Sequence, residues 1–204
     1  MTETCGVITA NSADFFVDKP ASCGPALPIF DTKCIDTDGK TVPTGEVGEL
    51  CVRGAQVIRG YLNREEETAE SITDGWLHTG DIARVDEDGF IFIVDRAKDM
   101  VLRGGENVYC AEVESALFDH PLVTECAVFG VPDDRLGEEV AAVLVLNRYE
   151  ENAADLLRAH CATRLAKYKI PRYIWIASEK LPRNASGKFL KRQLRDDYDL
   201  ADAV

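Results

Sequence analysis

The chain has 204 residues, of which 46% are hydrophobic and 29% charged, and its formal net charge is -13. This near-average composition excludes wholesale disorder and collagen-like repeats, and the acidic balance disfavours binding to nucleic acid phosphates. No stretch approaches the roughly 20 consecutive apolar residues that span a bilayer, and the N-terminus lacks the basic and apolar regions of a secretory signal. We therefore expect a cytoplasmic protein with no transmembrane segment and no nucleic-acid partner.

The first 95 residues have the pattern of short strands separated by turns. Glycines close the Asp-rich turns at 36–39 and 86–89, where a positive φ is needed. The flanking runs alternate in polarity and are rich in β-formers, and only one segment has a helical pattern. We predict strands at 32–35, 48–53 and 90–94, and a helix at 65–72.

The second half changes to a mixed pattern. Residues 111–120 and 153–165 place apolar side chains at helical spacing, and Pro121 ends the first of these segments. Buried strands are predicted at 123–131, 140–146 and 173–177, and a closing polar helix from 188 to about 196. Helices packed on a short sheet make an α+β unit.

A polar run, Asp95-Arg96-Ala97-Lys98-Asp99, separates these two patterns. A charged linker followed by a fresh apolar core is typical of two separately packed bodies. We therefore predict a β-rich domain over 1–95 and an α+β domain over 96–204. A surface turn inside a single domain is the alternative.

The seven cysteines are scattered, and no pair has the two-residue spacing of a zinc or redox motif. Most lie beside apolar residues, so we expect reduced thiols that act as small core side chains. The three histidines do not cluster, and neither His120 nor His160 is assigned a chemical role.

One polar stretch precedes the linker, and another follows it. Asp81 lies beside Gly80 at the predicted end of a strand, where its carboxylate can accept both hydroxyls of a diol. The alternative is that Thr79-Gly80-Asp81 is a turn without a binding role. Gly104 and Gly105 leave backbone that a slender ligand can approach, and they also suit a hairpin turn between two short strands.

Two further stretches lie in the second half. Residues 129–139, by themselves, are typical of a surface loop. Lys188 follows Gly187 but is no phosphate-binding P-loop lysine, because Phe189 follows it and Pro182 occupies the earlier glycine position. It is either a solvated surface lysine or a cation that a small-residue loop brings to a developing anion.

Taken together and in this order, these stretches resemble the C-terminal part of the acyl-adenylate-forming superfamily, which includes acyl-CoA synthetases and peptide-synthetase adenylation domains. The resemblance covers nearly the whole chain and is strongest toward acid–CoA ligases of the fatty-acid type. Its motifs include Gly45-Glu-Val-Gly-Glu49, Gly60-Tyr61, His78-Thr-Gly-Asp81, Asp95-Arg96, Glu112-Val-Glu114, Val131-Pro-Asp133, Gly137-Glu138 and Pro182 through Lys188.

The resemblance implies a nucleotide site in the first domain. Asp81 corresponds to the carboxylate that holds the ribose of ATP or AMP, and Arg96 to an arginine that contacts the nucleotide. Thr2 and Glu3 match the end of a motif whose Thr touches phosphate and whose Glu helps to hold Mg²⁺.

The resemblance also implies a mobile lid in the second domain. Lys98 matches the hinge, and Lys188 the catalytic lysine that bridges the carboxylate substrate and the α-phosphate. Arg103, Gly104 and Gly105 match the loop along which coenzyme A enters.

The implied fold is a partial, distorted barrel-like β subdomain followed by the small lid. The implied substrates are a carboxylic acid, ATP and coenzyme A. Because the family's phosphate loop and acid pocket do not occur here, we expect an inactive fragment of a longer enzyme, which packs on a missing N-terminal domain or self-associates. An adenylation domain that loads a carrier protein, and a non-catalytic module that binds coenzyme A or a partner, are the alternatives.

Overall fold

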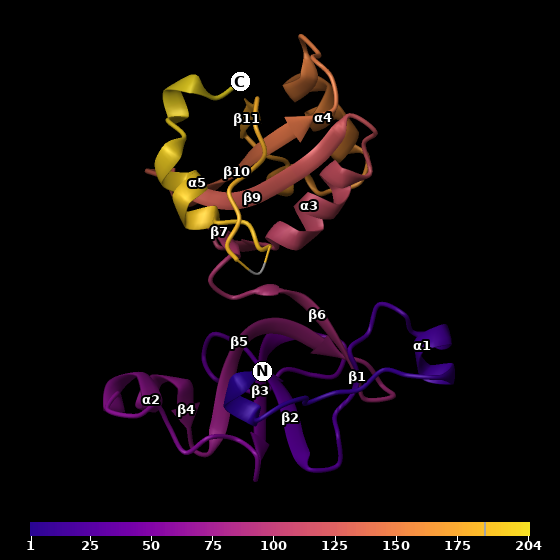
Figure 1. The fold of residues 1–204 in the computed structure, drawn as a ribbon, viewed down its shortest axis with the longest axis vertical. Helices are drawn as coiled ribbons and strands as arrows, with labels where there is room; N and C mark the ends of the chain where they lie inside the picture. The colour runs from indigo at the N-terminus through magenta and orange to yellow at the C-terminus, as the bar shows by residue number, and fades with distance from the viewer. Residues whose placement is uncertain (186) are drawn as a thin grey trace. The chain divides into compact units, whose positions relative to one another are not determined.

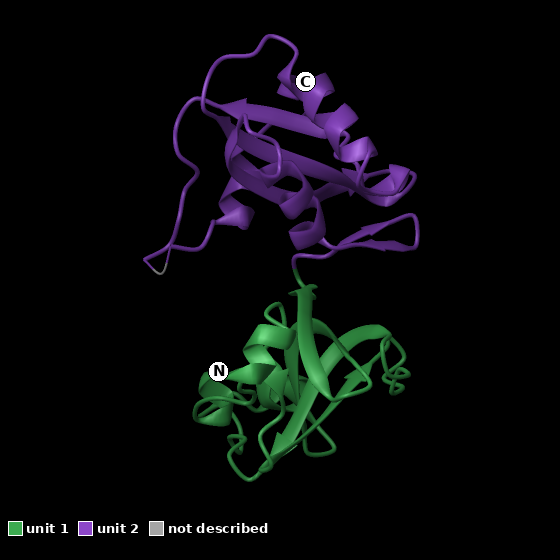
Figure 2. Cartoon of the chain, turned by 90° about the vertical axis from the view of Figure 1, so that its right-hand side faces the viewer, with its two compact units in different colours: residues 1–98 green, residues 99–204 purple. Residues whose placement is uncertain are grey.

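The computed structural model describes residues 1–185 and 187–204 and divides into two compact units, Met1–Lys98 and Asp99–Val204 (Figure 2). The division falls after Lys98 rather than after Asp95, where the sequence placed it. The reason is that strand β6 (Phe90–Arg96) continues through Arg96, which pairs with Asp81 on the neighbouring strand. Lys98 is exposed in the turn that follows.

Unit 1 is built on a curled antiparallel sheet that forms half a barrel (Figure 1). The strand order is β1-β6-β5-β3-β2, and β4 pairs with β5. Besides β6, the strands are β1 (Gly24–Pro25), β2 (Phe30–Ile35), β3 (Val47–Gly54), β4 (Ile72–Thr73) and β5 (Trp76–Val85). The predicted strands are thus present, each somewhat longer than its apolar run.

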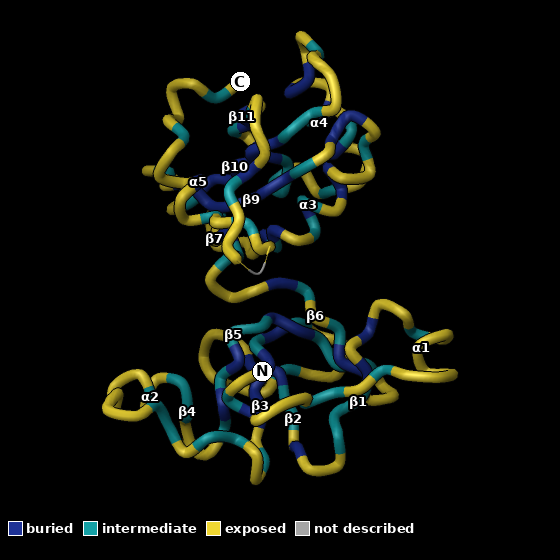
Figure 3. Tube along the Cα trace, in the orientation of Figure 1, coloured by how far each residue is buried: buried dark blue, intermediate teal, exposed yellow. Residues whose placement is uncertain are grey.

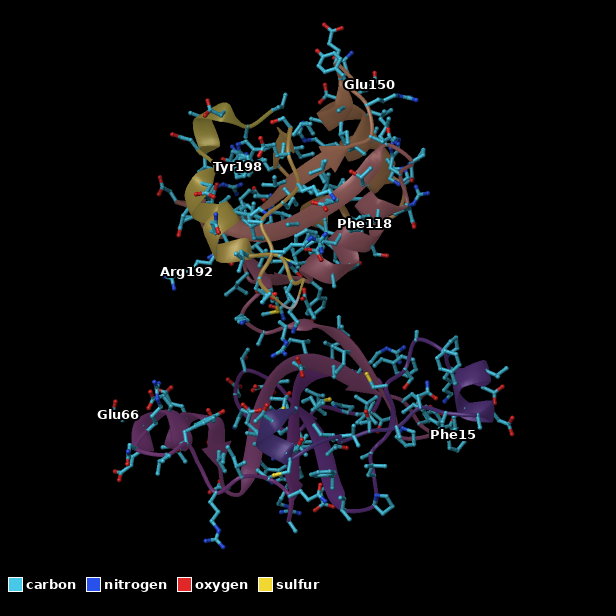
Figure 4. All side chains as sticks on the ribbon, viewed as in Figure 1. Phe15, Glu66, Phe118, Glu150, Arg192 and Tyr198 are labelled. Carbon is cyan, nitrogen blue, oxygen red and sulfur yellow. The ribbon has the colours of Figure 1, made fainter. Side chains whose placement is uncertain are left out.

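The core of unit 1 lies on one face of this sheet. Leu50 and Val52, two positions apart on β3, both point into it, as period-two alternation requires. The helices are η1 (Thr2–Thr4), α1 (Asp14–Asp18) and α2 (Glu65–Ser71). Helix α2 confirms the predicted helical segment, whereas α1 was not predicted. Phe15, labelled on α1 in Figure 4, stays exposed although its ring meets Phe90 edge-on.

Unit 2 contains a five-stranded sheet in the order β11-β10-β7-β8, with β9 also paired to β10. Its strands are β7 (Val101–Arg103), β8 (Glu106–Val108), β9 (Val123–Asp133), β10 (Gly137–Leu146) and β11 (Tyr173–Ala177). Strands β10 and β11 are parallel, and the other pairs are antiparallel. Phe129 and Val131 are buried in β9, which confirms the strand predicted at 123–131 and extends it to Asp133. The surface loop that 129–139 suggest by themselves is therefore wrong, and only 134–136 form the turn.

Helices cover both faces of the central strands, which are buried along most of their length (Figure 3). Ala142 and Leu144 of β10 pack in the cluster that contains α3 and α4, whereas Val143 packs in the cluster that contains Leu194 of α5. The helices are α3 (Cys110–Phe118), α4 (Ala153–Ala162), η2 (Lys167–Lys169), α5 (Lys191–Asp197) and η3 (Leu200–Asp202).

Three predicted helices are therefore present with shifted ends, and α5 starts at Lys191 instead of 188. In the described part of the chain, none of the helices is long and apolar enough to cross a membrane.

Candidate functional site

Asp81 and Arg96 face each other across the β5–β6 pair of unit 1. Asp81 lies inside β5, not at the end of a strand as the sequence suggested. Its Oδ1 is 2.7 Å from Nε of Arg96. A carboxylate offers about four lone-pair sites, so it can accept several hydrogen bonds at once. The structure therefore brings together two of the predicted nucleotide-binding residues.

A polar pocket of about 250 Å³ lies beside Arg96. It is lined by Met1, Glu3, Tyr61, Leu77, His78, Thr79 and Arg96. Glu3 is held there by its backbone carbonyl, which accepts from Ile58 N at 2.8 Å, and by its carboxylate, which accepts from the Tyr61 hydroxyl at 3.2 Å. Glu3 and Arg96 thus share one polar pocket, while Thr2 is exposed on η1.

The segment that leads to Asp81 is fixed from the neighbouring strand. Oε2 of Glu49 lies 2.9 Å from Nδ1 of His78, and its Oε1 accepts from Gly80 N at 3.1 Å. The Thr79 hydroxyl donates to the Leu50 carbonyl at 2.7 Å and accepts from Asp81 N at 3.1 Å. These bonds orient the backbone from which the Asp81 side chain projects.

Sequence reasoning did not identify Glu49 or Cys51 as part of this arrangement. Cys51 is paired with His78 in the β3–β5 register, and its Sγ lies 3.9 Å from the His78 Nδ1. Burial, aided by the charge of Glu49, raises the pKa of Cys51 to about 11. The two-residue spacing of 49 and 51 was a usable signal, because alternate residues of a strand share a face.

In unit 2, Gly104 and Gly105 form the turn of the β7–β8 hairpin, which confirms the hairpin interpretation. Their φ angles are +61° and +89°, in the region that favours glycine. A Cβ added to Gly105 would meet no atom within 4 Å, so the backbone is open on that side. The predicted approach of a slender ligand is therefore sterically compatible with the same turn.

Arg103 has a partner that the sequence did not reveal. Its guanidinium binds the carboxylate of Glu139 through Nε and through Nη2, the latter at 3.0 Å. Glu139 is only 1% exposed, and Arg172 lies 3.6 Å away on the same carboxylate. The hydrogen bonds that Arg103 donates to Glu139 raise the pKa of Arg103 further above its usual range. Two of the guanidinium nitrogens are thus engaged within the fold.

Lys188 is exposed on a loop whose ends are joined by a bridge between Arg183 and Phe189. Its backbone N donates to Oδ1 of Asn184 at 3.0 Å. Glu125 of β9 anchors the same loop, since its two oxygens accept from Leu181 N at 2.8 Å and from Arg183 Nη2 at 3.2 Å. Ser186, within this motif, lies outside the described residues. Because Lys188 and Phe189 belong to this loop, α5 starts at Lys191 and not at 188.

Two family models match two different segments of the chain. Residues 1–62 match the family model of the AMP-binding enzyme, and residues 112–188 match that of the AMP-binding enzyme C-terminal domain. A 2-succinylbenzoate–CoA ligase of Bacillus cereus is 44% identical over 196 residues, which are 96% of this chain and 40% of the relative.

Solved structures agree with these matches. One is o-succinylbenzoate CoA synthetase from Bacillus subtilis in complex with an acyl-adenylate intermediate, with a TM-score of 0.86, 43% identity, and coverage of 96% of this chain and 40% of that one. Another is an anthranilate CoA ligase in complex with anthranoyl-AMP, with a TM-score of 0.84, 34% identity, and coverage of 97% and 37%. The chain spans about 40% of the length of the curated relatives it matches. With two models matched in this order and relatives aligned over nearly all its residues, the chain belongs to the AMP-binding enzymes, of which it forms the C-terminal part.

Proposed function

We propose that this chain is part of an ATP-dependent, AMP-forming acid–CoA ligase. In the first half-reaction the acid and ATP give an acyl-adenylate and pyrophosphate, and in the second coenzyme A displaces AMP to give the thioester. The observation that carries this proposal is the 44% identity over 196 residues to a 2-succinylbenzoate–CoA ligase. For the same reason we propose an aromatic acid such as 2-succinylbenzoate as substrate, in place of the fatty acid expected from the motifs.

The nucleotide side of the proposal rests on unit 1. Asp81, with Arg96 at 2.7 Å, supplies acceptors for ribose hydroxyls. Glu3 supplies a carboxylate oxygen, the ligand type that Mg²⁺ prefers beside substrate phosphates, and it lines the pocket that contains Arg96. Bound Mg²⁺ would neutralise phosphate charge. Thr2, next in the chain and exposed, is assigned to a phosphate contact.

Lys188 is assigned to the adenylation step. Attack of a carboxylate on the α-phosphate brings two anions together, and a cation between them lowers the barrier. The exposure of Lys188 at a loop anchored by Glu125 supports this role, because its ammonium is accessible while its backbone is held.

The second half-reaction is assigned to the other motif of unit 2. The open backbone beside Gly105 is proposed to line the path of coenzyme A. Arg103 is proposed to brace the hairpin through Glu139 while its remaining nitrogen faces that path. Lys98, exposed in the turn between the units, is the proposed hinge, so that 96–204 acts as a mobile lid on 1–95. We also propose a cytoplasmic location, since seven free thiols suit a reducing compartment.

The reaction class is tested by joining this chain to the N-terminal body of the Bacillus subtilis synthetase. We expect thioester formation from 2-succinylbenzoate, ATP and coenzyme A by the chimera, and no acid-dependent ATP–pyrophosphate exchange by the isolated chain. A folded chimera without ligase activity would contradict the proposal, as would robust exchange by the chain alone. The acid itself is tested by assaying the longer protein that contains this chain with 2-succinylbenzoate and with a long-chain fatty acid.

Changing Lys188→Ala in the chimera separates the two half-reactions. Because one preorganised charge is removed from the first transition state only, adenylation should fall by about 10²–10³-fold. Thioester formation from supplied acyl-adenylate should stay within about twofold of the parent. Lys180→Ala is the matched control, as it removes another exposed lysine that lies just before the motif in the chain. Equal losses in both steps would show that Lys188 has a structural role.

A further inference from the structure

Three metal-binding side chains of different types meet on one face of the unit 1 sheet. Glu49 and Cys51 lie two positions apart on β3, and His78 is the register partner of Cys51 on β5. The register shifts between Glu49 and Cys51, and the Glu49 carboxylate reaches His78 on β5. Secondary structure therefore positions all three donors, and no mobile loop is required to assemble them.

The donor atoms are close enough to share one ion. Nδ1 of His78 is 2.9 Å from Oε2 of Glu49 and 3.9 Å from Sγ of Cys51, and all three donor atoms lie within 4.8 Å of one another. In a tetrahedral zinc site, bonds of about 2.0–2.3 Å place neighbouring donors roughly 3.3–3.8 Å apart. Side-chain torsion changes that move these donor atoms by up to about 1 Å would bring all three to such separations.

The environment also suits a bound cation. Cys51 is fully buried, and the side chains of Glu49 and His78 are about one quarter exposed, so that the cluster has a closed and an open side. His78 also lines the 250 Å³ polar pocket, from which water can reach the ion as a fourth ligand. Thiolate, imidazole and carboxylate together favour Zn²⁺ over Mg²⁺ or Ca²⁺, which prefer oxygen ligands alone.

We propose that Glu49, Cys51 and His78 bind one Zn²⁺. On binding, Cys51 releases its thiol proton to solvent, and neutral His78 keeps its proton on Nε2 and coordinates through Nδ1. Glu49 coordinates through Oε2, while its Oε1 keeps the hydrogen bond from Gly80 N, which orients the carboxylate. The site is distinct from the Mg²⁺ ligand proposed at Glu3, and it does not depend on the proposed ligase activity.

The test uses Co²⁺ as a spectroscopic probe on the purified chain. Cys5 and Cys23, the two exposed thiols, are first changed to serine so that they cannot bind the probe. We expect a thiolate-to-cobalt charge-transfer band in the near ultraviolet that saturates at one equivalent and disappears when Zn²⁺ is added. Absence of the band would overturn the proposal.

Variants then identify the ligands. Cys51→Ser should abolish the band, and His78→Gln and Glu49→Gln should each weaken Co²⁺ binding at least about 10-fold. Cys161→Ser is the matched control, because it makes the same change at another fully buried cysteine, and it should leave binding unchanged. Circular dichroism monitors folding, and His78→Gln keeps the test decisive if Cys51→Ser unfolds. A band of undiminished affinity in a folded Cys51→Ser or His78→Gln variant would refute the site.

Discussion

Glu139 is a buried acidic residue of β10, whose other buried residues are apolar. Arg103 and Arg172 both reach its carboxylate, and its own neighbour Val140 N donates to Oε1 at 3.2 Å. A buried carboxylate without such partners would be costly, since desolvation penalises an isolated charge strongly. The two arginines therefore make the position of Glu139 tolerable, and Glu139 in turn fixes the base of the Gly104–Gly105 turn through Arg103.

The thiols divide into two groups by exposure. Cys5 and Cys23 are exposed, so the expectation that cysteines act as core side chains holds for the other five only. Burial raises the pKa of Cys126 and Cys161, and also that of Cys51 in the metal-free chain, which keeps these thiols protonated near neutral pH.

We predict that a disulfide reagent titrates two thiols rapidly in the native chain and all seven in denaturant. The reason is that only the exposed sulfurs can be reached as thiolates near neutral pH. Changing Cys5 and Cys23 to serine should remove the rapid phase. Rapid reaction of a third thiol would contradict the burial described for the remaining cysteines.

Site residues were predictable where a motif contains them and unpredictable where a partner strand supplies them. Asp81 and Lys188 could be singled out because their spacing resembles a family pattern. Their contacts with the supporting residues, Glu49 for the first and Glu125 for the second, could not be predicted, because these are 32 and 63 residues away in the chain. Cross-strand register decides such contacts, and local sequence does not encode register.

At the scale of elements, periodicity located most helices and strands, and tertiary packing set their ends. The α3 and α4 segments were found from their apolar spacing. Residues 129–131 had two interpretations, the end of a strand and the start of a surface loop, and burial of Phe129 and Val131 decides for the strand. The short helix α1 was missed because its five residues carry too little periodicity.

The loop 183–189 depends on one carboxylate for its position. Glu125→Ala removes the acceptor of Leu181 N and the partner of Arg183, so we expect the Leu181 amide to exchange at least about 10-fold faster. Hydrogen exchange read by NMR measures this directly. Amides of β10 should be unaffected, and Glu151→Ala, at an exposed site, is the control. Unchanged exchange at Leu181 would mean that the bridge between Arg183 and Phe189 holds the loop without Glu125.

At the scale of the whole molecule, the two units have separate hydrophobic cores. The unit 1 core contains Val52 and Ile91, and the unit 2 cores lie on the two faces of β9 and β10. Each unit also contains one of the two tryptophans, Trp76 on β5 and Trp175 on β11. The stability of each unit can therefore be followed by itself.

We predict that Glu139→Ala destabilises unit 2 alone. Loss of the buried carboxylate leaves Arg103 unpaired, which should lower the free energy of unfolding by roughly 2–3 kcal/mol. In a Trp76→Phe background, denaturation followed by the fluorescence of Trp175 measures this change. Amide exchange at Val52 and Ile91 should stay unchanged, and the control Asp155→Ala, which breaks an exposed ion pair with Arg158 in unit 2, should cost under about 1 kcal/mol. Faster exchange at Val52 would show that the units unfold together.

The contiguity of each unit has a consequence for biosynthesis. Every strand pair of the first sheet joins residues within 1–98, so that sheet can close as soon as Arg96 has left the ribosome. The second sheet must wait longer, because β10 acquires its parallel partner β11 only after a further stretch that includes α4. Nascent chains stalled after β10 has emerged, but before β11 has, should therefore already resist protease over residues 1–98, while β10 still exposes an unpaired edge to chaperones.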